Sequence, residues 1–422
     1  MKTQLYSLVS LTIALFVSCV DDGPYEDYLV ARPLTMDIAA FKANAVEVTA
    51  PIPVVNSGKI YAYKDYIFVN DVNQGFHVID NQNPAAPKSI AFIKLEGNYD
   101  ISIKDDKLFA DSYGDLVVFD ISDINNIKVA NRLTSAIYEN WTCIAVDLEY
   151  PQADIFEYKD FNAQTEALIG WEVTTERRLV SDYEKQYGGH GLYYEDAIAT
   201  TNSFNSIVGQ GGSMARFKIV DDYLYVVDYS NINIFDIADL ENPEVLEDVH
   251  VGWDIETIFN QNDLLFLGGR QGMYIYDITE PAKPTFISEF RHGTACDPVV
   301  VDGDYAYVTL KGGTICGGTE SGLYVIDITD LKAPELKVIY PMEGPNGLGI
   351  KDDTLFICDG NAGLKVFDKS EAPNITQINQ FEAIQAYDVI PLSNSLLMIG
   401  ERKLYQYEYL ENDIRLISTF EL

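Results

Sequence analysis

One short pattern recurs along the chain: an apolar stretch of about five residues that ends in aspartate. Six segments carry it: 75–80, 116–121, 232–237, 272–278, 322–328 and 363–368. A seventh segment, 403–408, ends in glutamate. Four spacings between these acids are nearly equal, at 40, 41, 41 and 40 positions: Asp80 to Asp120, Asp236 to Asp277, Asp327 to Asp368 and Asp368 to Glu408. A period of about 40 residues built from strands is typical of a β-propeller with one blade per repeat.

Each repeat follows one plan around this pattern. An apolar segment leads through a short turn containing aspartate into a strand rich in Tyr, Phe and Val, then the aspartate-ended strand, a turn with proline and a fourth strand. The copy with strands at 255–259, 264–268, 273–277 and 285–290 is the clearest. Short strands between Gly and Asp turns, without helical periodicity, predict an all-β fold of four-stranded antiparallel blades.

The third strand of each repeat is apolar on both faces, as where Leu323 and Val325 alternate with Tyr324 and Ile326. A strand that is buried on both sides belongs inside a stack of sheets. The aspartate that ends it can accept backbone N–H bonds in a turn. We therefore interpret these acids as structural: Asp80, Asp120, Asp236, Asp277, Asp327 and Asp368.

One interval breaks the period, because 116 residues separate Asp120 from Asp236. Two eroded blades in this interval would make nine, whereas an insertion of about 75 residues would leave seven. The segment 143–148 imitates the repeat, but no Tyr-rich second strand precedes it. The sequence therefore predicts a seven-bladed propeller over 53–422, with an insertion at about 135–212 between blades 2 and 3.

The N-terminus reads as a secretion signal. Lys2 precedes an apolar run of about ten residues, which is too short for the roughly 20 residues of a membrane span. The Phe-Val-Ser-Cys sequence ending at Cys19 resembles a bacterial lipobox, although Phe16 stands where leucine is usual; a chance cysteine after an ordinary signal is the alternative. We expect a lipoprotein signal peptide at 1–18, lipid on Cys19 and a tether at 19–52, with a short helix at 36–44.

The Leu-Tyr-Val-Ile-Asp-Ile-Thr sequence at 323–329, followed by Asp330 and Pro334, resembles the LVIVD-repeat family of bacterial surface lipoproteins. The resemblance covers nearly the whole mature chain. It implies an extracytoplasmic propeller that is lipid-anchored at the outer membrane, on the cell surface. It implies no settled activity.

The net charge of the chain limits the classes of partner that it can bind. The chain has 65 acidic residues and 29 lysines and arginines, which give a net charge of −36. Phosphate binding depends on clustered Lys and Arg, and no such cluster occurs here. Nucleic acid is therefore excluded as a partner, while divalent cations and basic surfaces are permitted.

Four predicted inner strands begin beside an acid: Asp100, Asp254, Asp297 and Asp388. In a propeller, the loops entering inner strands and the loops between second and third strands share one face, and we expect binding there. The four carboxylates should ring the mouth of the central channel, where they could bind Ca²⁺ or a basic group. The alternative is that each accepts N–H bonds from its own or the next blade.

Other side chains are expected on the same face. Tyr99, Trp253 and Tyr387 adjoin three of the acids and could stack on sugar rings or pack against a protein, and His292 could add a polar group. Cys296 begins an inner strand and Cys316 lies in the long loop above the same blade. In an oxidising compartment this placement favours a disulfide between them.

No catalytic signature accompanies the repeat: a Gly-Lys-Ser/Thr phosphate loop, H-E-x-x-H and G-x-S-x-G are all absent from the sequence. We interpret the chain as a non-enzymatic binding or scaffold module for an envelope protein or a glycan, anchored to a membrane by lipid. The alternative is an enzyme acting on extracellular polysaccharide, with the channel-mouth carboxylates as catalysts.

Overall fold

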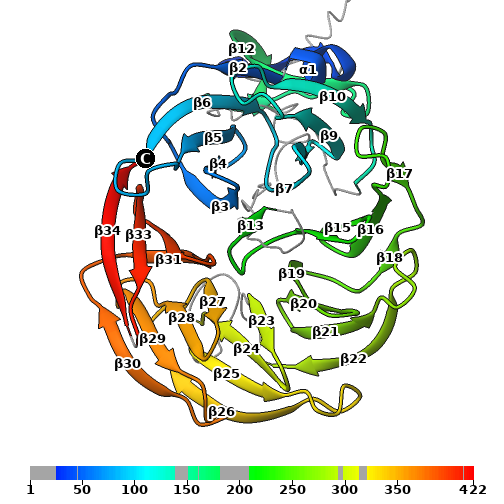
Figure 1. The fold of residues 1–422 in the computed structure, drawn as a ribbon. Helices are drawn as coiled ribbons and strands as arrows, with labels where there is room; N and C mark the ends of the chain where they lie inside the picture. The colour runs from blue at the N-terminus through cyan, green and yellow to red at the C-terminus, as the bar shows by residue number, and fades with distance from the viewer. Residues whose placement is uncertain are drawn as a thin grey trace, which may run out of the picture.

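The computed structural model describes residues 25–44, 46–137, 151–159, 161–180, 209–292, 298–312, 321–411 and 413–422. Strands dominate these residues, and consecutive antiparallel sheets are arranged around a common centre (Figure 1). The all-β architecture of four-stranded antiparallel sheets that the repeat predicts is thereby confirmed. We name each sheet by its first and last ring strands.

Of the first three sheets of the ring, the β3–β6 and β14–β18 sheets carry extra strands, whereas the β7–β10 sheet has four. The β3–β6 sheet contains β3 (Ser57–Tyr63), β4 (Tyr66–Asp71), β5 (Gly75–Asp80) and β6 (Lys88–Leu95), with β13 (Gln210–Gly211) beside β3 and β2 (Val46–Thr49) beside β6. The β7–β10 sheet contains β7 (Ile101–Lys104), β8 (Lys107–Ser112), β9 (Asp115–Asp120) and β10 (Lys128–Leu133). The β14–β18 sheet contains β14 (Phe217–Val220), β15 (Tyr223–Val227), β16 (Asn231–Asp236), β17 (Glu244–Val245) and β18 (Val249–His250), the last two both paired with β16.

The other ring sheets have four strands each. The β19–β22 sheet contains β19 (Ile255–Gln261), β20 (Leu264–Gly269), β21 (Gly272–Asp277) and β22 (Thr285–Arg291). The β23–β26 sheet contains β23 (Val299–Asp302), β24 (Tyr305–Leu310), β25 (Gly322–Asp327) and β26 (Glu335–Pro341). The β27–β30 sheet contains β27 (Leu348–Lys351), β28 (Thr354–Cys358), β29 (Leu364–Asp368) and β30 (Thr376–Phe381). The β31–β34 sheet contains β31 (Ala386–Pro391), β32 (Ser395–Gly400), β33 (Lys403–Tyr409) and β34 (Ile414–Glu421).

The third strand of a sheet is buried between two neighbours, as its two apolar faces predict. In β25, Leu323 and Val325 pack in a cluster with residues of β28, whereas Tyr324 and Ile326 pack in a cluster with residues of β20 and β21. Each strand thus contributes to two cores. The hydrophobic core of the ring lies between sheets and not within one of them.

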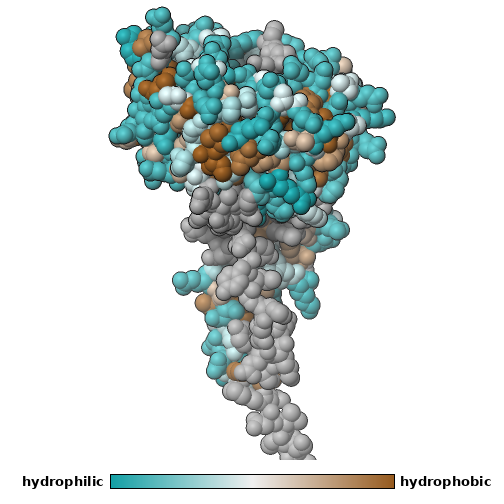
Figure 2. Space-filling model, turned by 90° about the horizontal axis from the view of Figure 1, so that it is seen from below, coloured by the Kyte–Doolittle hydropathy of each residue, from teal (hydrophilic) through white to brown (hydrophobic). Residues whose placement is uncertain are grey.

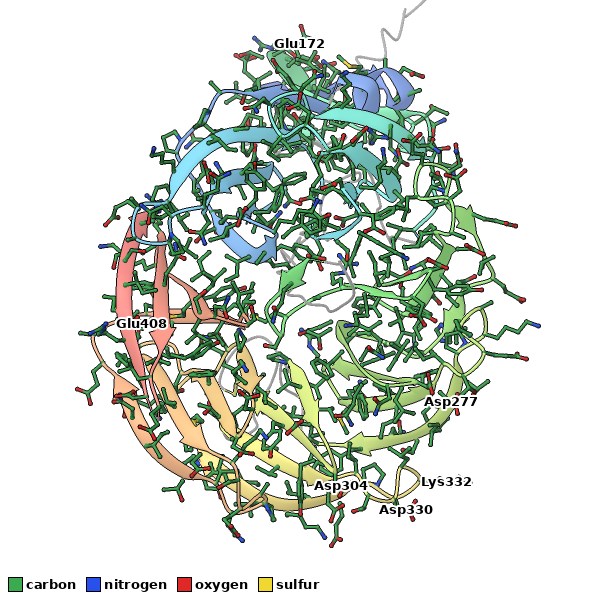
Figure 3. All side chains as sticks on the ribbon, viewed as in Figure 1. Glu172, Asp277, Asp304, Asp330, Lys332 and Glu408 are labelled. Carbon is green, nitrogen blue, oxygen red and sulfur yellow. The ribbon has the colours of Figure 1, made fainter. Side chains whose placement is uncertain are left out.

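The aspartates that end the third strands make turns, as predicted. The carboxylate of each accepts the backbone N–H two residues further on, at 2.7–3.0 Å, in all six copies: Asp80, Asp120, Asp236, Asp277, Asp327 and Asp368. The bonds from Ser122 lower the pKa of Asp120 to about 2. Asp277 and its counterpart Glu408 lie toward the outside of the ring (Figure 3).

The outer rim of the ring is mostly hydrophilic in the view of Figure 2, with hydrophobic residues scattered over it. Outer strands contribute exposed apolar side chains that include Phe286 of β22, Ile339 of β26 and Leu416 of β34. Single apolar residues of this kind are normal on protein surfaces. The rim by itself therefore indicates no binding surface.

A separate sheet lies against the ring beside β2 and β10 (Figure 1). Its central strand β1 (Tyr25–Asp37) pairs in parallel with β11 (Ile155–Phe156) and antiparallel, along its whole length, with β12 (Glu166–Leu179). Part of the segment expected as a tether therefore forms a strand with part of the expected insertion. The short helix predicted at 36–44 is confirmed as α1 (Ile38–Asn44).

Ion pairs hold this sheet together and bind α1 to the ring. Arg32 and Arg178 each contact both Glu157 and Glu176, with N···O distances of 2.6–2.7 Å, and these contacts lower the pKa of Glu176 to about 2. Lys42 of α1 reaches the buried Asp115 of β9 at 2.5 Å. No helix within the described segments is long and apolar enough to cross a membrane.

Candidate functional site

Loops from adjacent sheets meet on one face of the ring. The N–H of Ile255, at the start of an inner strand, donates to the carbonyl of Tyr229 in the β15–β16 turn of the neighbouring sheet, at 3.2 Å. The N–H of Arg270, in the β20–β21 turn, donates to the carbonyl of Asp254 at 2.9 Å. Loops that enter inner strands and loops between second and third strands are therefore neighbours, as expected from the blade plan.

One inner-strand position recurs around the centre of the ring. In each sheet, one residue of the inner strand pairs with the fourth residue of the second strand, and the recurring position is the residue directly before it. In the β7–β10 sheet, Ile101 pairs with Ala110, so the recurring position is Asp100. The residues at this position are Lys59, Asp100, Arg216, Thr257, Pro298, Gly347 and Asp388. Four of the seven are charged, with two of each sign. We call Lys59, Asp100, Arg216 and Asp388 the inner charge ring.

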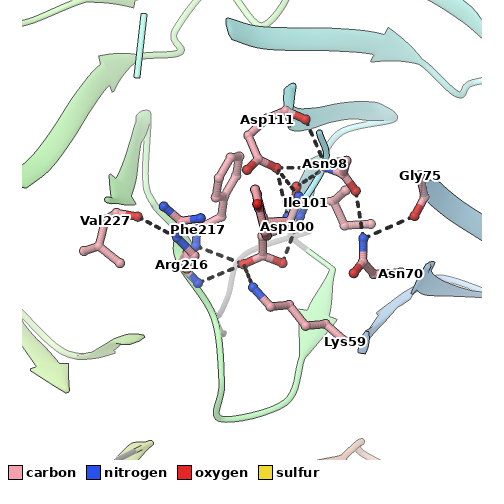
Figure 4. A network of polar contacts seen from close by, with 11 residues as sticks. Lys59, Asn70, Gly75, Asn98, Asp100, Ile101, Asp111, Arg216, Phe217 and Val227 are labelled. Atoms are coloured by element: carbon pink, nitrogen blue, oxygen red, sulfur yellow. Dashed lines mark hydrogen bonds and ion pairs between the residues drawn. The ribbon is translucent and has the colours of Figure 1, made fainter. Parts of the chain in front are cut away.

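Asp100 joins two sheets. Its Oδ2 accepts the backbone N–H groups of Arg216 and Phe217 at 2.8 and 3.2 Å, and its Oδ1 accepts that of Ile101 at 2.8 Å (Figure 4). The side chain is only 3% exposed. Asp100 therefore follows the second of the two interpretations drawn from the sequence, in which the acid bonds its own and the next blade.

The two basic members of the inner charge ring surround Asp100. Lys59 Nζ lies 3.9 Å from Asp100 Oδ2 and has no hydrogen-bond partner among the described residues, and burial lowers the pKa of Lys59 to about 8. Arg216 donates from Nε to the carbonyl of Val227 at 3.0 Å, and its guanidinium lies 5.6 Å from the ring centre of Tyr99. Tyr99 is therefore a packing partner of the charge ring.

Asp388 is enclosed in a different way. It is fully buried, and its Oδ1 accepts the N–H of Val389 at 2.9 Å and that of Ser213 at 3.3 Å. A Cβ atom added to either Gly212 or Gly347 would lie 2.0 Å from a carboxylate oxygen of Asp388. Two glycines thus let the backbone close around this acid. Burial also raises the pKa of the adjoining Tyr387.

Asp254 does not share this environment. In this sheet Thr257 occupies the recurring position, and Asp254 lies three residues before it. The expectation of four acids at matching positions is therefore wrong for Asp254. Its backbone has φ of 61°, and its side chain lies 3.8 Å from Arg270 Nη1. A hydrogen bond to Asp254 raises the pKa of the Tyr229 hydroxyl.

Aromatic rings gather next to Asp254. Trp253 is 63% exposed and Tyr229 46% exposed, and their ring centres are 6.0 Å apart in an edge-to-face arrangement. The ring of His250 lies 6.3 Å from that of Trp253, and its Nδ1 is 3.1 Å from Asn231 Oδ1. We call Tyr229, His250, Trp253, Asp254 and Arg270 the Trp253 cluster.

Several expected site residues lie outside the described residues: Cys19, Asp297, Cys296 and Cys316. The proposed lipidation and the proposed disulfide therefore remain predictions. His292, directly after β22, is half-buried, and its N–H donates to the carbonyl of Gln271 at 3.3 Å. Within the described ranges, no three metal-ligating side chains gather in one place.

A set of buried acids was missed by sequence reasoning. Asp71, Asp228 and Asp359 lie at the ends of second strands and are at most 1% exposed. Each accepts backbone N–H groups of nearby loops, as Asp359 does from Gly344 at 2.8 Å, and each contacts a polar residue of the third strand. Those third-strand partners are His77, Asn233 and Lys365. The spacing of an aspartate four residues before the glycine of the third strand, as in 71–75 and 359–363, was a signal that could have found two of them.

A family model described as the LVIVD repeat matches residues 56–92, 211–250 and 292–341. Three segments of the chain thus carry LVIVD repeats. In this LVIVD-repeat chain the matched segments include inner strands β3, β14 and β23, so they contain Lys59 and Arg216 of the inner charge ring, and the second ends at His250 of the Trp253 cluster. No curated protein matches the sequence.

Solved structures resemble the LVIVD-repeat chain in fold only. PorZ, a surface component of the type-IX secretion system of Porphyromonas gingivalis, is 13% identical with a TM-score of 0.48, over 87% of this chain and 39% of that chain. A functionally unknown protein from Desulfotomaculum acetoxidans is 11% identical with a TM-score of 0.46, over 86% and 95% of the two chains. BamB from Moraxella catarrhalis is 9% identical with a TM-score of 0.45, over 80% and 79%.

Proposed function

We propose that this protein is a seven-bladed propeller that serves as a non-enzymatic binding module, anchored through lipid on Cys19 to the outer membrane at the cell surface. The face that carries the Trp253 cluster would be turned toward a partner in the envelope. The observation that carries this proposal is the exposure of Trp253 and Tyr229 on loops that rigid sheets hold in place. Exposed side chains on such loops are where binding residues concentrate.

The sheet order supports the count of seven. The ring sheets run from β3–β6 to β31–β34, and strand β13 adds to the edge of β3. The segment between β10 and β14 contributes β11 and β12 to the separate sheet with β1. This distribution fits an insertion between the second and third blades better than it fits two eroded blades.

The alternative function was an enzyme that uses channel-mouth carboxylates on polysaccharide. Asp100 and Asp388 would have to reach a substrate, yet both are at most 3% exposed and accept two or three backbone N–H bonds. A carboxylate that is held in this way by N–H donors is stabilised as an acceptor and is poorly placed for proton transfer. Binding is therefore the function that these two acids support better.

The binding face is tested by photo-crosslinking in cells. An aromatic photo-crosslinking residue at position 253 should form adducts with an envelope component. The same residue at position 286 serves as the matched control, because Phe286 is also exposed, at 55%, but lies on the outer strand β22. Adducts at neither position, or the same adducts at both, would contradict the proposal.

The anchor is tested by fractionation. Replacing Cys19 by serine removes the thiol that would carry the lipid, so the Cys19→Ser protein should leave the membrane fraction and lose incorporation of labelled palmitate. An unchanged distribution between membrane and soluble fractions would show that the anchor is not at Cys19.

A further inference from the structure

We propose that the Trp253 cluster is a glycan-binding subsite that takes a neutral hexose ring. This inference rests on the proposed binding function and names the chemistry of the ligand at the same face. In this subsite the sugar ring would stack on Trp253, and its hydroxyl groups would form hydrogen bonds with Asp254, Arg270 and His250.

The indole of Trp253 is both exposed and fixed. Tyr229 and His250 contact it at interplanar angles of 65° and 80°, so both rings meet it edge to face. Such contacts fix the orientation of the indole while 63% of the residue stays in solvent. The weakly positive C–H groups on one side of a pyranose ring pack well on the negative face of an aromatic ring.

Polar groups with fixed directions adjoin this surface. The carboxylate of Asp254 is held between the hydroxyl of Tyr229 and the guanidinium of Arg270. Arg270 Nε is buried and has no hydrogen-bond partner within the described part of the chain. A carboxylate beside a guanidinium offers acceptors and donors side by side, which suits the adjacent hydroxyl groups of a sugar.

His250 adds a further group. Its Nδ1 faces Asn231 Oδ1 at 3.1 Å, which leaves Nε2 for a ligand, and the residue is exposed. The ring is therefore oriented by the protein before any ligand arrives. Preorganised groups of this kind lose little entropy on binding.

Charge selects a neutral sugar over an acidic one. The chain carries 65 acidic residues against 29 basic ones, and Glu247 and Asp248 directly precede the strand that ends at His250. An anionic polysaccharide would be repelled by this field. A protein partner is disfavoured for another reason: a stable interface buries about 800 Å² on each side, whereas a two-ring platform matches the size of one sugar.

The test is a titration of the full-length protein with neutral tetrasaccharides of glucose, mannose and galactose, and with tetragalacturonate as the acidic counterpart. Binding is followed by calorimetry. At least one neutral tetrasaccharide should bind, and tetragalacturonate should bind at least about tenfold more weakly. Trp253→Ala should weaken neutral binding by about tenfold or more, and Trp253→Phe by less, because a smaller ring remains.

The controls separate the binding role from a folding role. Phe286→Ala removes an exposed aromatic residue from the rim and should leave affinity unchanged. Trp253→Ala should melt at the wild-type temperature, because the side chain is mostly in solvent. If no neutral tetrasaccharide binds, or if Trp253→Ala binds as tightly as wild type, the glycan inference is wrong.

That failure can be told apart from a failure of the proposed function. Crosslinks from position 253 to an envelope protein, without any tetrasaccharide binding, would refute the glycan subsite and leave the binding module standing. The absence of both crosslinks and sugar binding would refute both.

Discussion

The inner charge ring and the Trp253 cluster both lie where loops enter inner strands, yet they differ in what surrounds their polar groups. Asp100 and Asp388 are buried and engaged by backbone N–H groups of two sheets. Asp254 lies outside the recurring position, and Trp253 beside it is exposed. Polar residues at the recurring position therefore join the blades, whereas residues displaced from it are free to meet a ligand.

Removing Asp100 should produce the largest loss of stability. Asp100→Ala leaves three backbone N–H groups without their acceptor and removes the acid that most strongly offsets the burial of the Lys59 charge. Breaking a buried pair of this kind costs about 3–5 kcal/mol. Urea unfolding should show this loss for Asp100→Ala and less than about 1 kcal/mol for Asp254→Asn. Equal losses in the two variants would remove the distinction between the two regions.

Filling the space beside Asp388 should have the next largest effect. A Cβ at Gly347 would lie 2.0 Å from Asp388 Oδ1 and 2.9 Å from its Cα, so both side chain and backbone must move. Overpacking of this kind costs up to about 3 kcal/mol. Gly303→Ala is a poor control because Gly303 has φ of 57°, whereas Gly344→Ala is a suitable one, since its nearest neighbour would be 3.9 Å away. Similar melting temperatures for the Gly347 and Gly344 variants would contradict the tight enclosure of Asp388.

Lys59 should make stability depend on pH. Burial lowers its pKa in the folded chain to about 8, from 10.5, while Asp100, Asp111 and Asp388 oppose the shift and Arg216 adds to it. Between pH 8 and 10 the unfolded chain binds more protons than the folded chain, so the free energy of unfolding rises with pH. The rise due to Lys59 is about 2 kcal/mol over this range.

Lys59→Met isolates this contribution, because it keeps the length of the side chain and removes the titrating amine. The difference in unfolding free energy between wild type and Lys59→Met should move by about 2 kcal/mol in favour of wild type between pH 8 and 10. The comparison is made as a difference because burial raises the pKa of tyrosines such as Tyr61, which therefore act in the opposite direction at higher pH. A pH-independent difference would contradict the buried, charged Lys59.

The sequence predicts the propeller scaffold better than the candidate site, because the scaffold depends on local interactions and the site depends on strand pairing. Each turn-making aspartate accepts a hydrogen bond from the residue two positions further on, so a short sequence pattern is enough to predict its role. The inner charge ring has no such pattern. Its position is set by pairing register, and chemically different residues occupy it, from Lys59 to Gly347.

The pairing of strands far apart in the chain could not be predicted from the sequence either. Strand β1 finds its partner β12 about 140 residues further along the chain, as in the pairing of Val30 with Thr174, and no local feature of either strand specifies the other. Trp253 could be named as a candidate from its place beside an inner strand. Its exposure depends on the backbone around it, where Gly252 and Asp254 both have positive φ.

The smallest effect is expected from Asp254→Gly, and it tests that backbone directly. Glycine adopts the φ of 61° without strain, which offsets the lost hydrogen bond to Tyr229 and the lost contact with Arg270. Both contacts are partly exposed, so the net change in unfolding free energy should stay within about 0.5 kcal/mol. Sugar affinity should nevertheless fall, because the carboxylate that faces the ligand is gone while Trp253 keeps its place. Asp254→Asn is the matched variant, since asparagine tolerates the same backbone and retains one acceptor oxygen. A loss of stability comparable to that of Asp100→Ala would mean that Asp254 joins the blades after all, and the contrast between the two regions would fail.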